Sequence, residues 1–145
     1  MRSASGRPDV RVRQNLDYDV EMKALLMASA AAARRAERPV VLDMRRLTPI
    51  CDYFVICSGR STVHTRAITD AIEEAAAEAQ MGRRHREGGR DAKWIVLDYG
   101  DVVVHVFGPE TREYYDLERL WRDARTVPVS EADMADEGTR EAALA

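Results

Sequence analysis

The sequence contains few cysteines, few aromatic residues and no long apolar segment. Two of its 145 residues are cysteines, Cys51 and Cys57. On one extended segment they would lie roughly 20 Å apart, beyond the reach of a disulfide, so we expect two buried, reduced thiols. No apolar run approaches the roughly 20 residues that cross a bilayer, and the N-terminus lacks the hydrophobic segment of a secretory signal. We therefore predict a cytoplasmic protein that does not bind membranes.

The chain also lacks the residue patterns that hold metals, cofactors and catalytic groups. His64, His85 and His105 have no metal-ligand spacing to the cysteines. The segment Ser58–Ser61 lacks the glycine patterns of phosphate-binding loops, and no Asp-x-Asp follows it to hold metal ions for nucleotidyl transfer. We expect no metal, no cofactor and no catalytic residue, and hence no enzyme. A nucleotide-binding, transferase-like enzyme that uses this turn is the alternative from another class.

Charge is nearly balanced overall but uneven along the chain. The net charge is −3, which does not suggest nucleic-acid binding. Residues 1–16 carry +3 and residues 127–145 carry −4. Both ends are polar and aperiodic, which predicts a flexible tail over 1–18, one domain over 19–124 and an acidic, disordered tail over 125–145. The Arg-rich start leaves a fragment of an organelle transit peptide as an alternative.

Three arginine pairs stand out within the predicted domain. They are Arg34-Arg35, Arg45-Arg46 and Arg83-Arg84. No aromatic residue is interleaved with them, as it would be in a surface that stacks on bases, so solvated faces are favoured. We expect no sequence-specific nucleic-acid partner.

Hydrophobic periodicity predicts alternating helices and strands. The first helix has Asp19 as its cap and ends before Pro39. The second helix follows a Ser61 cap and has an apolar stripe that runs from Val63 to Ala79. The order describes an α+β domain with a mixed β-sheet and helices packed against it. The predicted elements are a helix over 19–37, strands over 40–44 and 53–57 that pair antiparallel, a helix over 61–79, a short edge strand near 84–86, a hairpin over 94–107 and a final helix that begins at 108–110.

The final helix is predicted as one continuous element with a proline near its first turn. Tyr114, Leu117 and Trp121 share one face. Glu118 and Arg122 form an ion pair on the surface, one helical turn apart.

The segment Trp94–Phe107 is the most informative part of the chain. It predicts a hairpin joined by a short Tyr-Gly or Gly-Asp turn. Both turns give the same two faces, because in either register an even-numbered residue of one strand lies opposite an odd-numbered residue of the other. One face is apolar and belongs to the core; it holds Ile95, Leu97, Val102, Val104 and Val106. The other face mixes aromatic, acidic and apolar residues; it holds Trp94, Val96, Asp98, Asp101, Val103 and His105.

The residues alone leave two interpretations of the mixed face open. Asp98 and Asp101 flank the turn, where like charges repel, and a basic partner would relieve that repulsion with Trp94 as its anchor. Alternatively, a helix of the same domain covers this face, buries Trp94 and leaves both carboxylates at the rim. For His105, a cross-strand contact with Trp94 is the simpler account. The exposed apolar part of the hairpin would also suit a homodimer or a general interaction module.

Short motifs follow one another over roughly residues 20–122. In this ordered combination the sequence resembles the ribosomal silencing factor family, also called the RsfS or Iojap family. Each motif alone is weak, and the combination is specific. The tails and the Arg-rich loop at 82–86 depart from the family pattern. The matching segments are Val41-Leu42-Asp43, Asp52 to Ser61, His64, Ala67-Ile68, Glu87-Gly88, Trp94 to Phe107 and Arg112 to Trp121.

The resemblance implies a nucleotidyltransferase-like α+β fold without transferase activity, in agreement with the missing carboxylate pair. It further implies a translation repressor that binds the large ribosomal subunit through ribosomal protein fourteen. Such a factor blocks joining of the small subunit, especially under nutrient limitation. Trp94, Asp98 and Asp101 fall in the family's partner-contacting segment. We therefore predict a partner-binding site made of Trp94, Val96, Asp98, Tyr99, Asp101 and His105.

Overall fold

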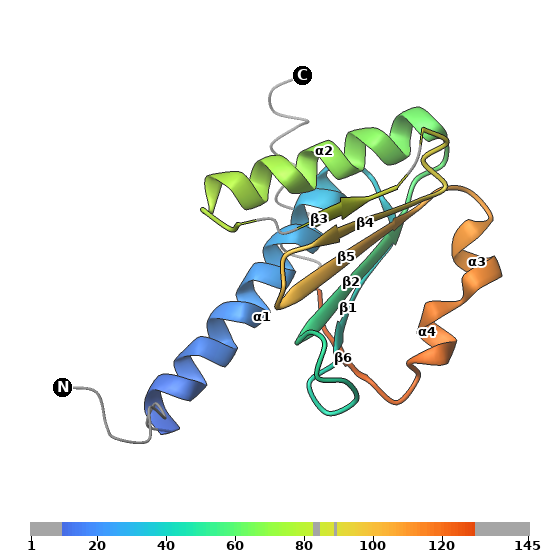
Figure 1. Ribbon diagram of the computed structural model, residues 1–145. Helices are drawn as coiled ribbons and strands as arrows, with labels where there is room; N and C mark the ends of the chain where they lie inside the picture. Colours follow the sequence, from blue (N-terminus) through green and yellow to red (C-terminus); the bar gives the residue numbers. More distant parts are fainter. Residues whose placement is uncertain (1–9, 83–84, 89, 130–145) are drawn as a thin grey trace.

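The computed structural model describes residues 10–82, 85–88 and 90–129, with side chains from residue 20 onward. Helices and strands in this part of the chain form an α+β fold, as predicted (Figure 1). In chain order they are α1 (Val10–Ala33), β1 (Glu37–Asp43), β2 (Tyr53–Ser58), α2 (Thr62–Glu78), β3 (His85–Glu87), β4 (Trp94–Asp98), β5 (Val102–Phe107), α3 (Thr111–Tyr115), α4 (Leu117–Leu120) and β6 (Arg125–Val127).

The six strands form one mixed sheet in the order β3-β4-β5-β2-β1-β6. β2 and β5 run parallel, and the other neighbours are antiparallel. The predicted antiparallel pair of β1 and β2 is confirmed, and so is a short edge strand, β3. Arg83 and Arg84, which belong to the predicted Arg-rich loop and edge strand, lie outside the described residues. Parallel neighbours need a long crossover, and α2 lies in the connection between β2 and β5.

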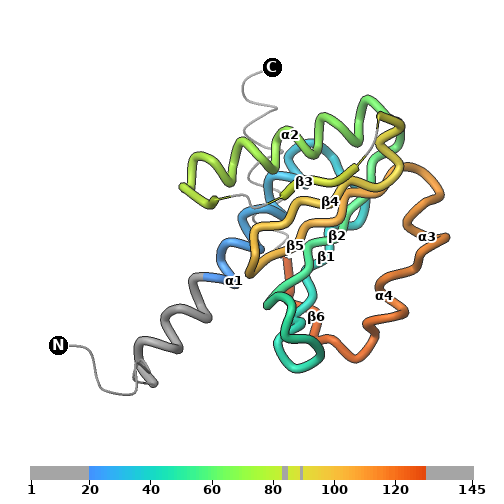
Figure 2. Tube along the Cα trace, viewed as in Figure 1, coloured from blue at the N-terminus to red at the C-terminus, as the bar shows by residue number. Residues whose placement is uncertain are grey.

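α1 and α2 cover one face of the sheet, where they cross each other (Figures 1 and 2). Ala24, Ala28 and Ala31 of α1 are fully buried, and their small side chains let the two helices and the strands approach closely. The predicted apolar face of the hairpin lies in this core, as expected from alternation. The main cluster includes Ala24, Met27, Ala28, Ala31, Val55, Ile68, Ile72, Ile95, Leu97, Val102, Val104 and Val106.

α3 and α4 lie on the opposite side of the sheet from α1 and α2 (Figure 1). They cover the end of the sheet near β1 and β2. Leu117 of α4 is buried there, and Trp121 packs beside it. The buried members of this second cluster are Leu42, Met44, Cys51, Ile56, Phe107 and Leu117.

α1 differs from the predicted helix at both ends. It begins at Val10, inside the range predicted as a flexible tail. It ends at Ala33 and not at residue 37, because Arg35 adopts a left-handed φ of 60°. The Ala36 N–H then donates to the Ala31 carbonyl at 3.0 Å, which is a Schellman end.

Ser61 caps α2 as predicted, since its hydroxyl accepts the His64 N–H at 3.1 Å. The buried stripe is displaced from the predicted one, and Val63 is 77% exposed. Thr65 and Thr69 are buried in its place. Their hydroxyls donate to carbonyls one turn earlier, each at 2.8 Å. A threonine satisfied in this way can face a core, which a hydrophobicity pattern does not reveal.

The predicted final helix consists of two short helices, which meet at Asp116 with its left-handed φ of 49°. Leu117 is buried but Tyr114 is 82% exposed, so they do not share a buried face as predicted. The predicted ion pair of Glu118 with Arg122 is also wrong. Glu118 turns the other way and accepts hydrogen bonds from a buried arginine.

That arginine is Arg112, which is only 3% exposed. Its Nε and Nη2 donate to Glu118 at 2.9 and 3.1 Å. Its Nη1 donates to the Ser58 hydroxyl at 3.2 Å, and the carbonyls of Glu37 and Arg38 accept at 2.9 and 2.8 Å. All five N–H groups of the guanidinium therefore have an acceptor. The side chain joins α3 and α4 to the ends of β1 and β2.

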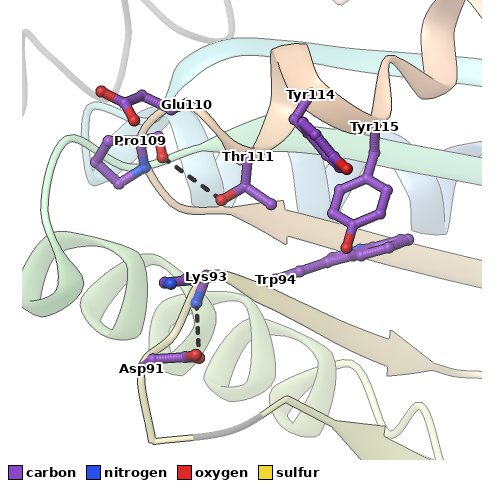
Figure 3. Close-up of a pocket in the computed structure, with 8 residues that line it drawn as sticks. All are labelled: Asp91, Lys93, Trp94, Pro109, Glu110, Thr111, Tyr114 and Tyr115. Carbon is purple, nitrogen blue, oxygen red and sulfur yellow. Dashed lines mark hydrogen bonds between the residues drawn. The ribbon is translucent and has the colours of Figure 1, made fainter.

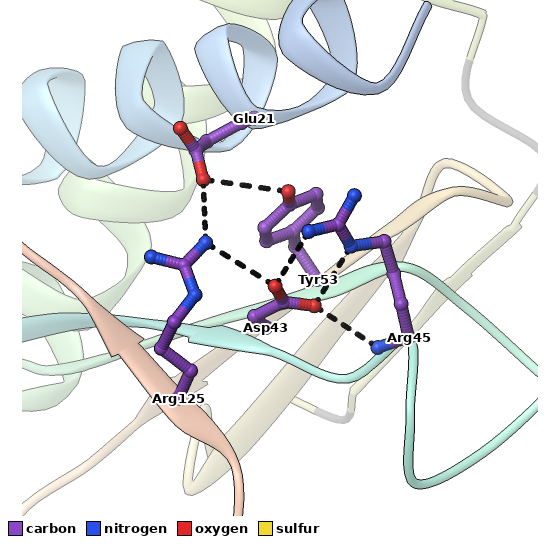
Figure 4. Close-up of polar contacts among 5 residues, drawn as sticks. All are labelled: Glu21, Asp43, Arg45, Tyr53 and Arg125. Carbon is purple, nitrogen blue, oxygen red and sulfur yellow. Dashed lines mark hydrogen bonds and ion pairs between the residues drawn. The ribbon is translucent and has the colours of Figure 1, made fainter. Parts of the chain in front are cut away.

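β6 lies in the range predicted as the acidic tail, and charged side chains tie it to the domain (Figure 4). Arg125 donates to Glu21 of α1 at 2.9 Å and to Asp43 of β1 at 3.2 Å. Hydrogen bonds from Arg45, with a smaller effect of Arg125, hold the pKa of Asp43 at about 2. A three-residue strand has no usable periodicity, and its partners are distant in sequence, so the tail boundary at 125 was wrong.

Cys51 and Cys57 are buried and unpaired, as predicted. Burial raises the pKa of their thiols to about 11 and 12, which keeps both protonated. No helix among the described residues has the length and hydropathy to cross a lipid bilayer.

We predict that Arg112→Met lowers the free energy of unfolding by about 3 kcal/mol, because the buried acceptors of the guanidinium lose their hydrogen-bond donors. Urea unfolding followed by circular dichroism measures the effect. Arg119→Met, at an exposed position on α4, is the matched control and should change stability by no more than about 0.5 kcal/mol. Equal stability of the two variants would contradict a clamping role for Arg112.

Candidate functional site

The mixed face of the β4–β5 hairpin lies on the same side of the sheet as α3 and α4. Trp94, Val96 and Asp98 alternate along β4 and are half-buried. Val96 pairs with His105 of β5, so the structure brings four of the six predicted site residues together. The α3–α4 layer covers part of this face, and the half-buried residues of β4 lie beside it. Both interpretations of the face are therefore partly realised: one end is packed internally and the other is accessible.

Trp94 is held in place by aromatic and polar contacts. Its Nε1–H donates to Nδ1 of His105 at 3.1 Å. Its ring centroid lies 5.1 Å from that of Phe107 and 4.5 Å from that of Tyr115 on α3. The predicted cross-strand contact of Trp94 and His105 is thus present. The indole is fixed before any partner arrives, which lowers the entropy cost of docking.

His105 is 7% exposed and packs edge-on against Phe54, with ring centroids 4.6 Å apart. Burial lowers its pKa from 6.5 to about 4, so the ring is neutral at physiological pH. Because Nδ1 accepts the Trp94 N–H, the neutral ring carries its proton on Nε2. That Nε2 is buried without a hydrogen-bond partner among the described residues. His105 therefore supports Trp94 from within the face, and its burial limits direct contact with a partner.

The two carboxylates beside the turn point to different sides of the sheet. Asp98 accepts the Gly100 N–H at 2.7 Å and so shapes the turn. Asp101 lies 3.7 Å from Nζ of Lys23 on α1, on the side opposite Trp94. The prediction that Asp101 shares a face with Trp94 is wrong, because alternation fails in the turn and the lysine attracts the carboxylate. The predicted repulsion between the two aspartates is relieved within the chain.

Tyr99 is also separated from the other predicted site residues. It is 8% exposed and belongs to the main core on the α1–α2 side. Its N–H donates to the Val102 carbonyl at 2.9 Å and closes the turn. The sequence prediction missed Tyr115 and Phe54, which extend the aromatic face. Tyr115 stands in the matched motif near the C-terminal helices, but nothing in its spacing shows that it reaches Trp94.

The turn at Ser58–Ser61, which raised the alternative of a nucleotide-binding enzyme, uses two of its backbone donors within the protein. The Gly59 N–H donates to the Phe107 carbonyl at 2.8 Å, and the Arg60 N–H donates to Nδ1 of His64 at 2.9 Å. A Cβ at Gly59 would lie 2.5 Å from Thr65 Oγ1, so glycine is required for packing. Two of the amides that a phosphate-binding loop would present are therefore used within the protein.

Among the residues that the structure describes, no group of His, Cys, Asp and Glu side chains could hold a metal ion. What the hairpin face offers is a fixed indole, a neighbouring carboxylate and apolar surface. These are features of a docking surface.

Comparison with known proteins decides which family carries this surface. The family model described as "Ribosomal silencing factor during starvation" matches residues 18–144. The chain belongs to the ribosomal silencing factor family. Ribosomal silencing factors are non-enzymatic, ribosome-binding regulators of translation with the large subunit as partner, and this is the function of the chain at that level of detail.

Relatives and solved structures support the assignment. The ribosomal silencing factor RsfS of Bacillus subtilis is 40% identical over 116 residues, which is 79% of this chain and 96% of that protein. A crystal structure of a protein from Bacillus halodurans is 38% identical, with a TM-score of 0.62 over 71% of this chain and 93% of that one. A crystal structure of a protein from Chromobacterium violaceum is 29% identical, with a TM-score of 0.68 over 70% of this chain and 85% of that one.

We predict that His105 makes the stability of this silencing factor fall as pH drops from 6.5 towards 4. The folded protein resists protonation of the buried ring, whereas the unfolded chain accepts the proton, so stability rises with pH in this window. His105→Phe removes this dependence. Urea unfolding at pH 7 and pH 4.5 should show that the wild type loses roughly 2–3 kcal/mol more than the variant. Parallel losses in the two proteins would contradict the burial of a neutral His105.

Proposed function

We propose that the protein represses translation by binding the large ribosomal subunit through ribosomal protein fourteen. In this position it blocks joining of the small subunit, especially when nutrients are limited. The mechanism is steric, and the protein supplies a surface and not a reaction. Cytoplasmic location belongs to the same proposal, since the factor must act where ribosomal subunits join.

The observation that carries the proposal is that Trp94 is partly exposed and held in a fixed orientation. A tryptophan that is half-buried and fixed by His105 and Tyr115 has already lost most of its conformational freedom. Its indole stays partly exposed, and tryptophan is among the residues that most often dominate binding energy. Val96, next along the same face of β4, is also half-buried, so a partner that covers Trp94 would bury it too.

Asp98 gives this surface its charge. It stands on the same face of β4 as Trp94 and is half-buried. A basic protein surface approaching the face would be attracted to the carboxylate, which raises the association rate and selects against acidic partners. We assign the docking surface to Trp94, Val96 and Asp98, with His105 beneath them. Asp101 is directed towards Lys23 and contributes at most to the edge of the surface.

We predict that Trp94→Ala combined with Asp98→Ala lowers affinity for purified large subunits at least tenfold, because the anchor and the charge are lost together. Co-sedimentation with separated subunits measures this loss, and circular dichroism checks the fold. Since Trp94 also packs internally, Val96→Arg is the second variant: it keeps the indole and places a charge on the docking surface. Asp101→Asn, on the other side of the hairpin, is the matched control and should bind like the wild type.

The same preparations test the mechanism. Adding small subunits to large subunits saturated with the wild-type protein should give fewer joined ribosomes in a gradient, and the double variant should restore joining. Normal binding by a folded Val96→Arg variant would place the interface elsewhere. A homodimer through the same face would appear as a concentration-dependent increase in sedimentation that large subunits reverse.

A further inference from the structure

Beside Trp94 the surface is hollowed into a pocket of about 500 Å³ (Figure 3). Trp94, at the start of β4, and the segment before it supply one wall, and α3 with the loop before it supplies the other. The pocket therefore depends on α3 being held over the sheet. None of the lining residues other than Trp94 belongs to the docking surface assigned above. The lining consists of Asp91, Lys93, Trp94, Pro109, Glu110, Thr111, Tyr114 and Tyr115.

Three aromatic rings of this pocket stand at different angles to one another. The Trp94 and Tyr115 rings are 4.5 Å apart between centroids and inclined by 44°, and the Tyr114 and Tyr115 rings are 5.0 Å apart and inclined by 84°. Tyr114 is 82% exposed and Tyr115 is 49% exposed, so neither ring is buried in the core. Rings arranged around a corner in this way form the walls of aromatic cages, which bind cations through the negative ring faces.

The charges around the rings favour a cation. Asp91 and Glu110 line the pocket and carry negative charge, whereas Lys93 is the single positively charged lining residue. The Asp91 carboxylate accepts the Lys93 backbone N–H at 3.3 Å and thereby stays at the mouth of the pocket (Figure 3). An acidic ligand would meet this excess of negative charge, and a neutral apolar ligand would gain nothing from it.

The pocket is built before a ligand arrives. Ala92 and Glu110, which flank the two walls, hold left-handed φ values of 51° and 72°, a conformation that costs free energy for residues other than glycine. The Arg112 clamp fixes α3 against the strand ends. A cage held open by such supports loses little entropy when a ligand binds.

We propose that this pocket is an aromatic cage for one basic side chain, a lysine or arginine, of the ribosomal partner. The proposal rests on the proposed docking function and adds a defined chemistry to it. The aliphatic stem of the basic residue lies along Trp94, and its charged head lies between the tyrosine rings and Asp91. The cage makes α3 part of the interface. The interface then prefers partners that present an exposed basic residue opposite the pocket.

We expect Tyr114→Leu to lower affinity for purified large subunits about 3- to 10-fold, because leucine keeps apolar area but has no ring face. Tyr114→Phe is the matched control and should retain wild-type affinity, since it keeps the ring. Co-sedimentation of the full chain at two salt concentrations measures both. Wild-type affinity of Tyr114→Leu, together with lost binding by the Trp94→Ala, Asp98→Ala variant, would overturn the cage and leave the docking function intact.

A second measurement needs no ribosome. The Trp94 indole N–H resonance, assigned by its absence in Trp94→Phe, is followed by NMR while N-acetyl-arginine amide is added. We expect a saturable shift that Tyr114→Leu reduces and Tyr114→Phe preserves. The neutral N-acetyl-norleucine amide should shift the resonance far less. An equal response to both compounds, or none to the arginine compound, would overturn the cage.

Discussion

The buried guanidinium of Arg112 is the constraint on which the functional half of the molecule depends. A charge 3% exposed is tolerated only when every donor is satisfied, and here Glu118, Ser58 and two carbonyls of β1 supply the acceptors. The acceptors come from segments far apart in the sequence. Their convergence holds two helices that are too short to be stable alone over the end of the sheet.

The position of α3 and α4 gives the sheet two unlike faces. α1 and α2 cover the first face and bury its main apolar cluster, with alanines that permit close packing. The second face is covered at one end and leaves Trp94, Val96 and Asp98 half-buried beside it. The second face is therefore the one on which we place the docking surface. Two amides of the strand-to-helix turn at Ser58–Ser61 donate to Phe107 and His64, so they are not available to a phosphate.

Local rules predicted much of this arrangement. Period-two alternation assigned the core face of the hairpin, Ser61 was recognised as a cap, and the short β1–β2 connection indicated antiparallel pairing. The failures share a cause. Asp101 pairs with Lys23, Glu118 pairs with Arg112, and Arg125 of β6 pairs with Glu21. In each case the partner lies outside the local pattern from which the prediction was made. A periodicity argument includes no such partner.

The sequence by itself determined the α+β class, the ordered motifs of the ribosomal silencing factor family and the mixed composition of the hairpin face. These properties depend on neighbours within a few residues or on the order of motifs. Only the tertiary structure decided that Tyr115 reaches Trp94, that His105 is neutral beneath it and that Asp98 and Asp101 point apart. Burial and charge pairing depend on distances in space between segments that the chain brings together only on folding.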